Sequence, residues 1–444
     1  MASTLHELAS KMDQLYEFDR EPVSNDKLQS GPKFAGLFAG EHVAATEFVI
    51  GAFFVLHGVS AADLIGGLLL GNILAVLSWT FICAPIATKT RLTLYWQLRD
   101  IGGPGLMAIY NVVNGVLFCG LAGAMVSVAA TAVGLGLGVP SPELDAILPT
   151  SAGWIAITLT IGALMTVVAI LGFEKVSQFA EICSPWMFAV FLAGALALLP
   201  SLGVHTDFSN FWEVARTKIW TGVAEAGQEK YGFWHIAFFS WVCNASFHLG
   251  LTDMATLRYA PNWKYGLFSA FGMFPGHFLA WICSGIMVAA VAREMNPGLM
   301  AYEAAGLAGA FAVLVAGWTT ANPTLYRAGL ALQTVTPNWP RWKVTLIAGA
   351  ITTVVACFPV IFMRLLDYIA WYGLISVPIG SVVFSELVVL PRMGGPKAPT
   401  GVPINKAALI TWIVATAAVL VVPLHPFYKP VPAWILGIVL YTLL

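Results

Sequence analysis

Glu41 and Glu47 stand in the first long apolar stretch of the chain, residues 34–60. A carboxylate inside hydrocarbon costs about 3 kcal/mol and is therefore a candidate for function. Small residues between the two, including Ala44 and Ala45, allow the helix to break and to leave carbonyl oxygens free for a cation. The pair indicates binding of a cationic solute or ion, or carriage of a coupling proton. If the helix begins later in the stretch, Glu41 lies at the cytosolic interface and has none of these roles.

The stretch at residues 232–252 carries a second group of polar side chains. Asn244 and His248 are four residues apart and share one face of a continuous helix. On that face they could line a central cavity, with Trp241 as a stacking surface for a flat solute. They could equally hold neighbouring helices together by hydrogen bonds. The candidate solute ligands in this stretch are Trp241, Cys243, Asn244 and His248.

A third group lies at residues 316–323. Pro323 has no N–H, so the carbonyl oxygen of Thr319 lacks its helical partner. That oxygen and the hydroxyls of Thr319 and Thr320 are hard ligands of the kind that suit Na⁺. Threonine hydroxyls in helices also bond back to the preceding turn, which is the alternative interpretation. Asn322 is a further candidate solute ligand in the same stretch.

These groups belong to a chain that is too apolar for a water-soluble protein. Of its 444 residues, 58% are hydrophobic and 10% are charged, and the mean hydropathy is +0.79. Soluble domains carry about 25% charged residues, because their surface faces water. The surplus apolar surface requires lipid.

Charge and residue spacing exclude several functions. Lys and Arg number 22 and Asp and Glu number 23, so the chain has no basic footprint for nucleic acid. His42 and His248 have no Cys, Asp or His partners at catalytic or metal-ligand spacing. The sequence therefore predicts neither an enzyme nor a bound cofactor.

About twelve stretches are long enough to cross a hydrocarbon core of ~30 Å as helices. They lie at 34–60, 61–88, 104–136, 152–173, 178–200, 232–252, 265–292, 304–333, 343–362, 367–390, 408–424 and 431–444. The predicted fold class is an all-α integral membrane protein. Basic residues gather at 89–99, 258–264, 341–343 and 392–397, which predicts that these loops are cytosolic. Both termini are then cytosolic, and we expect a plasma membrane, or the inner membrane of a bacterium.

The longest polar interruption after the N-terminal tail divides the spans into two blocks. We predict a cytosolic tail at 1–33, a five-helix block at 34–200, an extracellular connector at 201–231, a second five-helix block at 232–390 and two further helices at 391–444. Aromatic and apolar residues in the connector favour a helix lying on the membrane surface. An odd number of spans in each block forces any repeat to be inverted.

Several short motifs follow one another along spans one to ten. They are Gly71-Asn72-Ile73-Leu74, the segment from Ala87 to Arg99, the segment from Gly172 to Pro185, Arg258-Tyr259-Ala260, and Trp318-Thr319-Thr320 with Leu325-Tyr326 and Gly329. Their order and spacing resemble the nucleobase–cation symporter family, the cytosine, purine and hydantoin permeases. The resemblance implies the leucine-transporter fold, with inverted five-helix repeats, broken first and sixth helices, and Na⁺ between helix 1 carbonyls and helix 8 hydroxyls. The sodium ligands that it implies are Glu41, Ala44, Ala316, Thr319 and Thr320.

The chain departs from this family at the solute site. Members of the family hold a flat ring between aromatic side chains of helices 1, 3 and 6. The positions that the resemblance places there are Ala45 or Thr46, Phe118, and Asn244 or Ser246. Two of the three aromatic walls are therefore lost, and the added glutamates make the pocket acidic. The candidate solute ligands added by this comparison are Ala45, Thr46, Glu47, Asn114 and Phe118.

Together these patterns predict a secondary active transporter. It would import a small polar solute, nucleobase-like or otherwise nitrogenous, with Na⁺ by alternating access. Its expected partners are the solute, the ion and the bilayer. One alternative is coupling to H⁺ carried by Glu41 or Glu47, with a cationic or other non-nucleobase solute. Another is a sensor on the same scaffold that binds solute and transports none; the oligomeric state stays open.

Overall fold

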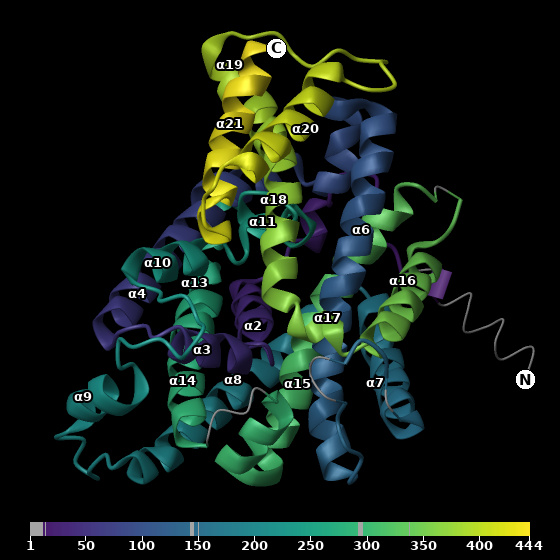
Figure 1. Cartoon of the computed structure of the whole chain (residues 1–444). Helices are drawn as coiled ribbons and strands as arrows, with labels where there is room; N and C mark the ends of the chain where they lie inside the picture. The colour runs from purple at the N-terminus through teal and green to yellow at the C-terminus, as the bar shows by residue number, and fades with distance from the viewer. Residues whose placement is uncertain (1–11, 14, 143–145, 150, 292–295, 337) are drawn as a thin grey trace, which may run out of the picture.

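The computed structural model describes residues 12–13, 15–142, 146–149, 151–291, 296–336 and 338–444. Residues 1–11 and 14 of the predicted N-terminal tail lie outside this range. Within the described residues the regular structure is helical, apart from one isolated β-bridge between Ser60 and Thr221. The helices form one bundle (Figure 1). The predicted all-α membrane fold is confirmed.

Seven helical segments are long and apolar enough to cross a bilayer, and a bent pair makes an eighth. The pair is α2 (Gly31–His42) and α3 (Glu47–Leu56), which bend by 49° at their break. The seven are α4 to α5 (Ala61–Thr90), α6 (Leu94–Gly136), α7 (Ala152–Ile170), α8 (Phe173–Leu198), the segment Trp263–Ala290 that ends with α14 (Ala280–Ala290), α15 (Pro297–Gln333), and the segment Leu365–Met393 that runs from α18 (Leu365–Phe384) to α19 (Leu390–Met393).

Four shorter apolar segments complete the predicted order of about twelve spans. The sixth span is divided into α10 (Phe233–Val242), α11 (Ala245–His248) and α12 (Met254–Leu257). The ninth, eleventh and twelfth are α16 (Arg341–Ala356), α20 (Lys406–Val421) and α21 (Pro430–Leu443). A single-turn helix, α17 (Val360–Met363), joins α16 to α18.

The first and sixth spans are both broken. Val43 leaves the helical region, with φ −97° and ψ 52°, and helix resumes after Thr46. In the sixth span Asn244 interrupts the helix, with φ −108° and ψ 24°, and Leu251 takes a left-handed conformation, with φ 62°. Each break frees backbone amides and carbonyl oxygens in the middle of the bundle. The breaks that the family resemblance implied are present, whereas apolar length alone gives no sign of them.

Spans that are five apart share irregular features. α6 bends at Gly103, with φ 81°, and α15 bends at Gly306, with φ 59°. A side chain at either position would strain the backbone. The second and seventh spans contain π-helical segments, Trp79–Cys83 and Gly272–Leu279. With the broken first and sixth spans, three pairs of spans five apart thus share an irregularity.

The predicted connector, residues 201–231 between the fifth and sixth spans, contains the short helix α9 (Phe211–Val214). This helix continues as a π-helical turn to Ile219. Trp212 is 55% exposed, whereas Ile219 and Trp220 are buried, so the C-terminal end of this helix is anchored on the bundle. α9 and the C-terminus lie at opposite ends of the molecule (Figure 1).

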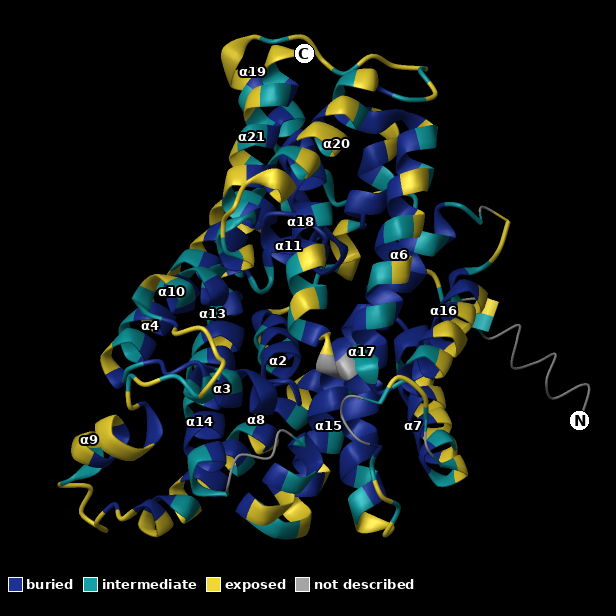
Figure 2. Cartoon of the chain, in the orientation of Figure 1, coloured by how far each residue is buried: buried dark blue, intermediate teal, exposed yellow. Residues whose placement is uncertain are grey.

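Burial is greatest at the centre, around α2, α11 and α15 (Figure 2). The outward faces of the peripheral helices carry exposed apolar side chains, such as Leu164 on α7, Val354 on α16 and Ile413 on α20. Water-soluble proteins rarely expose so much apolar surface, and these faces suit contact with lipid tails. The polar groups of the first, sixth and eighth spans therefore meet in the middle of the bundle, away from lipid.

Candidate functional site

A cavity lies at the breaks in the first and sixth spans. Its volume is about 50 Å³ for the centres of water molecules, enough for a few waters or one small solute. Its walls come from the first, third, sixth, seventh, eighth and tenth spans. Its polar lining residues are Glu41, His42, Thr46, Glu47, Cys243, Asn244, Ser246, His277, Trp281, Thr320, Thr324 and Tyr372.

The structure places some of the predicted site residues in this lining and others outside it. Those that line the cavity are Glu41, Ala44, Thr46, Glu47, Cys243, Asn244 and Thr320. Those that lie outside the lining are Ala45, Asn114, Phe118, Trp241, His248, Ala316, Thr319 and Asn322.

The two predicted residues of the third span lie behind Tyr372 of α18. Asn114 accepts a hydrogen bond from the Tyr372 hydroxyl at 2.7 Å. Phe118 packs edge-on against the Tyr372 ring, with ring centroids 5.2 Å apart. Tyr372 itself lines the cavity, whereas Phe118 does not.

The break in the sixth span separates the residues predicted to share one helical face. Asn244 lines the cavity. The His248 ring packs 4.6 Å from that of Trp79, and His248 Nε2 contacts the Trp241 carbonyl oxygen at 2.9 Å. The Trp241 indole N–H donates to Ser78 at 2.9 Å. In this structure His248 and Trp241 hold helices together, which was the alternative interpretation of this group.

Two other predicted solute ligands are enclosed by protein. Ala45 is fully buried among apolar neighbours. Asn322 is fully buried in α15, and neither of its amide heteroatoms has a hydrogen-bond partner among the described residues. Neither side chain reaches the cavity in this conformation.

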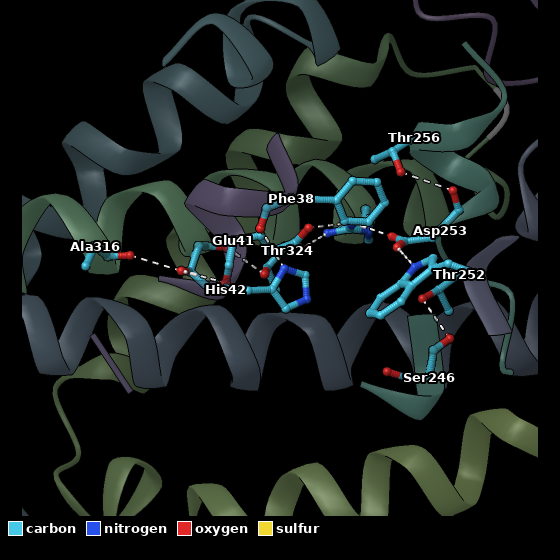
Figure 3. Close-up of polar contacts among 12 residues, drawn as sticks. Phe38, Glu41, His42, Ser246, Thr252, Asp253, Thr256, Ala316 and Thr324 are labelled. Atoms are coloured by element: carbon cyan, nitrogen blue, oxygen red, sulfur yellow. Dashed lines mark hydrogen bonds and ion pairs between the residues drawn. The ribbon is translucent and has the colours of Figure 1, made fainter. Parts of the chain in front are cut away.

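The predicted sodium ligands converge between α2 and α15. Thr320 Oγ1 lies 3.3 Å from the carbonyl oxygen of Glu41 and 3.0 Å from that of Ala316. Thr319 Oγ1 lies 3.1 Å from the same Ala316 oxygen. Figure 3 shows Glu41 and Ala316 on either side of this contact. Oxygens from the end of a broken helix and from a second helix therefore meet beside the cavity.

This oxygen set fits a sodium ion. Hydroxyl and carbonyl oxygens are hard ligands, and a hydroxyl that donates a hydrogen bond keeps lone pairs for a cation. The remaining predicted ligand, the Ala44 carbonyl, accepts the N–H of Glu47 at 3.1 Å. The set that the structure brings together is thus smaller than the predicted one and lies at the last turn of α2.

The Glu41 side chain belongs to a different contact, a buried triad of charges. Arg327 of α15 binds the Glu41 carboxylate with both terminal nitrogens and also binds Asp253. All three side chains are at most 5% exposed. Trp79 donates to Asp253 at 2.6 Å, and the Phe247 ring lies 4.7 Å from the guanidinium carbon. Figure 3 shows Glu41 and Asp253 approaching from separate broken helices. The triad thus has two carboxyl groups for one guanidinium.

Glu47 begins α3 and has different partners. The Trp281 indole N–H donates to its Oε2, and His277 Nε2 lies 3.8 Å from its Oε1. The hydroxyl of Ser284 donates to the Glu47 carbonyl oxygen at 2.8 Å. His277 stacks on Trp281, with ring centroids 4.2 Å apart. Within the described part of the chain, no Lys or Arg forms an ion pair with this carboxylate.

Sequence reasoning missed Arg327, Asp253, His277 and Trp281. Arg327 and His277 both lie inside predicted spans, so the rule that selected the two glutamates applies to them as well. Asp253 lies just past the predicted end of the sixth span, where a charge is unremarkable. Nothing in the sequence distinguishes Trp281 from the other tryptophans of the chain.

The N-terminal tail contacts the bundle through Glu17. Its carboxylate accepts hydrogen bonds from the hydroxyls of Tyr259 and Tyr326, both at 2.9 Å, and from the N–H of Phe173 at 3.2 Å. Arg258 donates to the Glu17 carbonyl oxygen at 2.6 Å and is fully buried. Arg258 was predicted to lie in a cytosolic loop, and in the structure the tail covers its side chain.

No protein-family model matches the chain, and no curated protein matches its sequence. Solved structures do match. One is Mhp1, a nucleobase-cation-symport-1 family transporter, in a closed conformation with bromovinylhydantoin bound; it has a TM-score of 0.72 and 16% identity over 97% of this chain and 95% of that one. The inward-facing conformation of Mhp1 has a TM-score of 0.72 and 15% identity over 95% of this chain and 92% of that one.

A Na⁺-coupled sialic acid symporter in a substrate-bound, outward-open state is also similar. It has a TM-score of 0.69 and 13% identity over 100% of this chain and 96% of that one. The chain therefore has the fold of these transporters over nearly its whole length. The resemblance found from short motifs is confirmed at the level of the fold.

Proposed function

We propose that the protein is a secondary active transporter that imports a small polar solute together with Na⁺ by alternating access. Its fold is shared with a nucleobase-cation-symport-1 transporter and with a Na⁺-coupled sialic acid symporter. One observation carries the proposal: Thr320 Oγ1 lies 3.3 Å from the Glu41 carbonyl oxygen, at the wall of a central cavity. Two helices that are far apart in sequence thus offer cation ligands beside a space for a solute.

The coupling ion would be held by two carbonyl oxygens and two hydroxyls. These are the carbonyl oxygens of Glu41 and Ala316 and the hydroxyls of Thr319 and Thr320. An ion there ties the last turn of α2 to α15 and favours the conformation in which the cavity is formed. A solute in the cavity favours the same conformation, so each ligand raises the affinity for the other.

The solute would be a small nitrogenous compound, nucleobase-like or smaller. The cavity of about 50 Å³ excludes large molecules in this conformation. Its wall offers carboxylate and hydroxyl acceptors, which bind N–H donors, and the aromatic rings of Phe247, Trp281 and Tyr372. Helices 1, 2, 6 and 7 would then move against the others to expose the cavity to either side.

We place the transporter in the plasma membrane, with both termini cytosolic. Residues 34–200 and 232–390 would be its two repeats, 201–231 its extracellular connector and 391–444 its two added helices. The basic loops support this orientation. The position of α9 opposite the C-terminus agrees with it (Figure 1).

Sodium binding can be tested with the ion alone. Purified protein in detergent should melt at a higher temperature in NaCl than in choline chloride of equal ionic strength, because a ligand stabilises the state that binds it. Thr320→Ala should raise the Na⁺ concentration needed for half of this shift about tenfold, or ~1.4 kcal/mol. Thr166→Ala is the matched control, since Thr166 is buried and bonds only within α7. An unchanged Na⁺ requirement in Thr320→Ala would remove the proposed site.

Coupling to H⁺ is the second candidate, and one observation favours it. Glu47 lines the cavity without a Lys or Arg partner among the described residues, so it can exchange a proton. Proteoliposomes with an inward pH gradient and no Na⁺ separate the two. Solute uptake driven by that gradient alone would identify H⁺ as the coupling ion.

A further inference from the structure

The charged groups at the cavity fall into a compensated set and an uncompensated one. Glu41 and Asp253 share the guanidinium of Arg327, which is fully buried. Glu47 has no such partner in the described chain; its carboxylate meets only the Trp281 N–H and the His277 imidazole. A buried carboxylate without a nearby cation is costly, and the cost is removed when a cation binds.

The other groups that face Glu47 do not compensate its charge. His277 is itself held by Cys243, with Sγ 3.9 Å from Nδ1, and by Asn244, with Nδ2 3.5 Å from Nε2. The other polar residues that line the cavity include no Lys or Arg; they are Glu41, His42, Thr46, Ser246, Thr320, Thr324 and Tyr372. Since the triad has two carboxyl groups for its one guanidinium, it offers no spare positive charge to Glu47.

A second observation points to a ligand at this place. His42 is 3% exposed and lines the cavity, and its Nε2 has no hydrogen-bond partner among the described residues. Its Nδ1 is already occupied by the carbonyl oxygen of Phe38 at 2.7 Å. The His42 ring lies 4.9 Å from that of His277, so this free nitrogen is next to the Glu47 site. A buried polar atom without a partner is a group that a solute can satisfy.

The aromatic lining favours a positive charge over a negative or neutral one. Trp281, Phe247 and Tyr372 all border the cavity. The faces of aromatic rings attract cations, most strongly where water is excluded. An anionic solute would meet the Glu47 carboxylate and would be repelled.

We propose that the solute is a small organic cation, and that Glu47 binds its ammonium, amidinium or guanidinium group beside the Trp281 ring. This inference rests on the proposed function and narrows its substrate class. The solute's N–H groups donate to the Glu47 carboxylate. Because His42 Nδ1–H donates to the Phe38 carbonyl oxygen, Nε2 of the neutral ring is an acceptor and meets a further N–H of the solute. The proposal separates the role of Glu47 from that of Glu41, whose charge is already matched.

Two pairs of probes with nearly the same shape test the charge preference directly. Guanidinium is compared with urea, and acetamidinium with acetamide, each at millimolar concentration in NaCl with choline balancing the ionic strength. In a thermal-shift titration of the purified protein, the cations should bind at least tenfold more tightly than their neutral partners. Equal shifts from cation and neutral partner would overturn the proposal without use of any variant.

Variants then test whether Glu47 is the residue that binds the cation. Glu47→Gln keeps the size and the acceptor for the Trp281 N–H, and should abolish the preference for cations. Glu47→Asp keeps the charge but moves it back by one methylene, and should weaken binding while the preference stays. Glu213→Gln, at an exposed carboxylate of the connector, is the matched control and should behave as the wild type. A full cation preference in Glu47→Gln would overturn the assignment.

The outcomes are distinguishable from a failure of the proposed function. Sodium stabilisation and its loss in Thr320→Ala depend on oxygens at α2 and α15, not on the Glu47 carboxylate. If Na⁺ binds normally but the cations show no preference, the transporter proposal stands and the substrate class is wrong. If Na⁺ does not shift the melting temperature while the organic cations bind through Glu47, sodium coupling is wrong and Glu47 is still the cation-binding residue.

Discussion

Glu41 and Glu47 end one half of a broken helix and begin the other, and they differ in every partner. Glu41 binds the guanidinium of Arg327 in the eighth span, and the same guanidinium also binds Asp253 in the sixth span. Glu47 faces an indole N–H and an imidazole. The same residue type therefore does two different things within one turn and a half of chain. One carboxylate fastens helices together, and the other is available to a ligand.

The two environments also explain how both carboxyl groups are accommodated in the middle of the bundle. For a buried carboxylate that is paired and hydrogen-bonded, interactions within the protein offset the free-energy cost of desolvation. For an unpaired buried carboxylate, that cost is offset only by protonation or by binding of a cationic ligand. The first arrangement gives stability and the second gives affinity, so substitutions should separate these two properties.

Replacing Arg327 with Met should have the largest effect. The change leaves Glu41 and Asp253 buried without a cation, and removal of one partner from such a site costs about 3–5 kcal/mol. We expect a large fall in the melting temperature of the purified protein and a low yield. Glu47→Gln should by comparison leave the melting temperature nearly unchanged in the absence of solute.

The matched control for this change is Arg364→Met. Arg364 is 75% exposed and pairs only with Asp367, three residues away. Exposed pairs of this kind contribute little. Two outcomes would contradict the assigned roles of Glu41 in helix packing and Glu47 in ligand binding. One is a melting temperature of Arg327→Met equal to that of the wild type, and the other is a melting temperature of Glu47→Gln as low as that of Arg327→Met.

Glu17 provides an intermediate case: its carboxylate accepts hydrogen bonds from neutral donors, while the Arg258 guanidinium lies close by and donates to the Glu17 carbonyl oxygen. Its oxygens accept from Tyr259, Tyr326 and the Phe173 amide. Glu17→Gln replaces one acceptor oxygen by a donor and should weaken the attachment of the tail by about 1–3 kcal/mol. Hydrogen exchange should rise at residues 15–20 and at the start of α8. Asp26→Asn, at an exposed site on the same tail, should leave exchange unchanged; equal protection in Glu17→Gln would show that the tail is held by other contacts.

The sequence could predict the spans but not the partners of their charges. A span is a property of one continuous stretch, so apolar length was sufficient to find the first, sixth and eighth. The contact of Arg327 with Asp253 joins residues 74 positions apart and the contact with Glu41 joins residues 286 apart, and no local pattern specifies either. Charge pairing is a tertiary property, and it decides which glutamate is available.

Local patterns also failed where the backbone departs from a regular helix. Asn244 and His248 are four residues apart, and helical spacing gave them one face. The break at Asn244 turns one side chain to the cavity and leaves the other against Trp79. The contact between Thr320 and the Glu41 carbonyl oxygen was expected from the family resemblance, which supplied the break in helix 1 and its meeting with helix 8. Spacing alone could not supply either, and sodium binding by these oxygens stays a prediction.

A histidine–carboxylate pair at the surface provides the mildest contrast to Glu47 and His277. His425, between α20 and α21, lies 3.9 Å from the Glu229 carboxylate and 3.3 Å from the Tyr231 hydroxyl. It is partly exposed, whereas His277 is 4% exposed. Water screens the surface pair, so its charge should matter less.

The pH dependence of stability should show this small effect. Burial lowers the pKa of His425 below 6.5, and this outweighs the opposing influence of Glu229. Since the folded state favours neutral imidazole, its stabilising contribution is complete above pH 6.5 and is lost as the pH falls toward the lower folded pKa. His425→Gln, which retains a hydrogen-bonding group near Tyr231, should make the melting temperature fall less steeply between neutral pH and about pH 5. His205→Gln, at an exposed histidine of the connector, is the control and should follow the wild-type curve. If His425→Gln also followed the wild-type curve, the acid sensitivity would arise from groups other than His425.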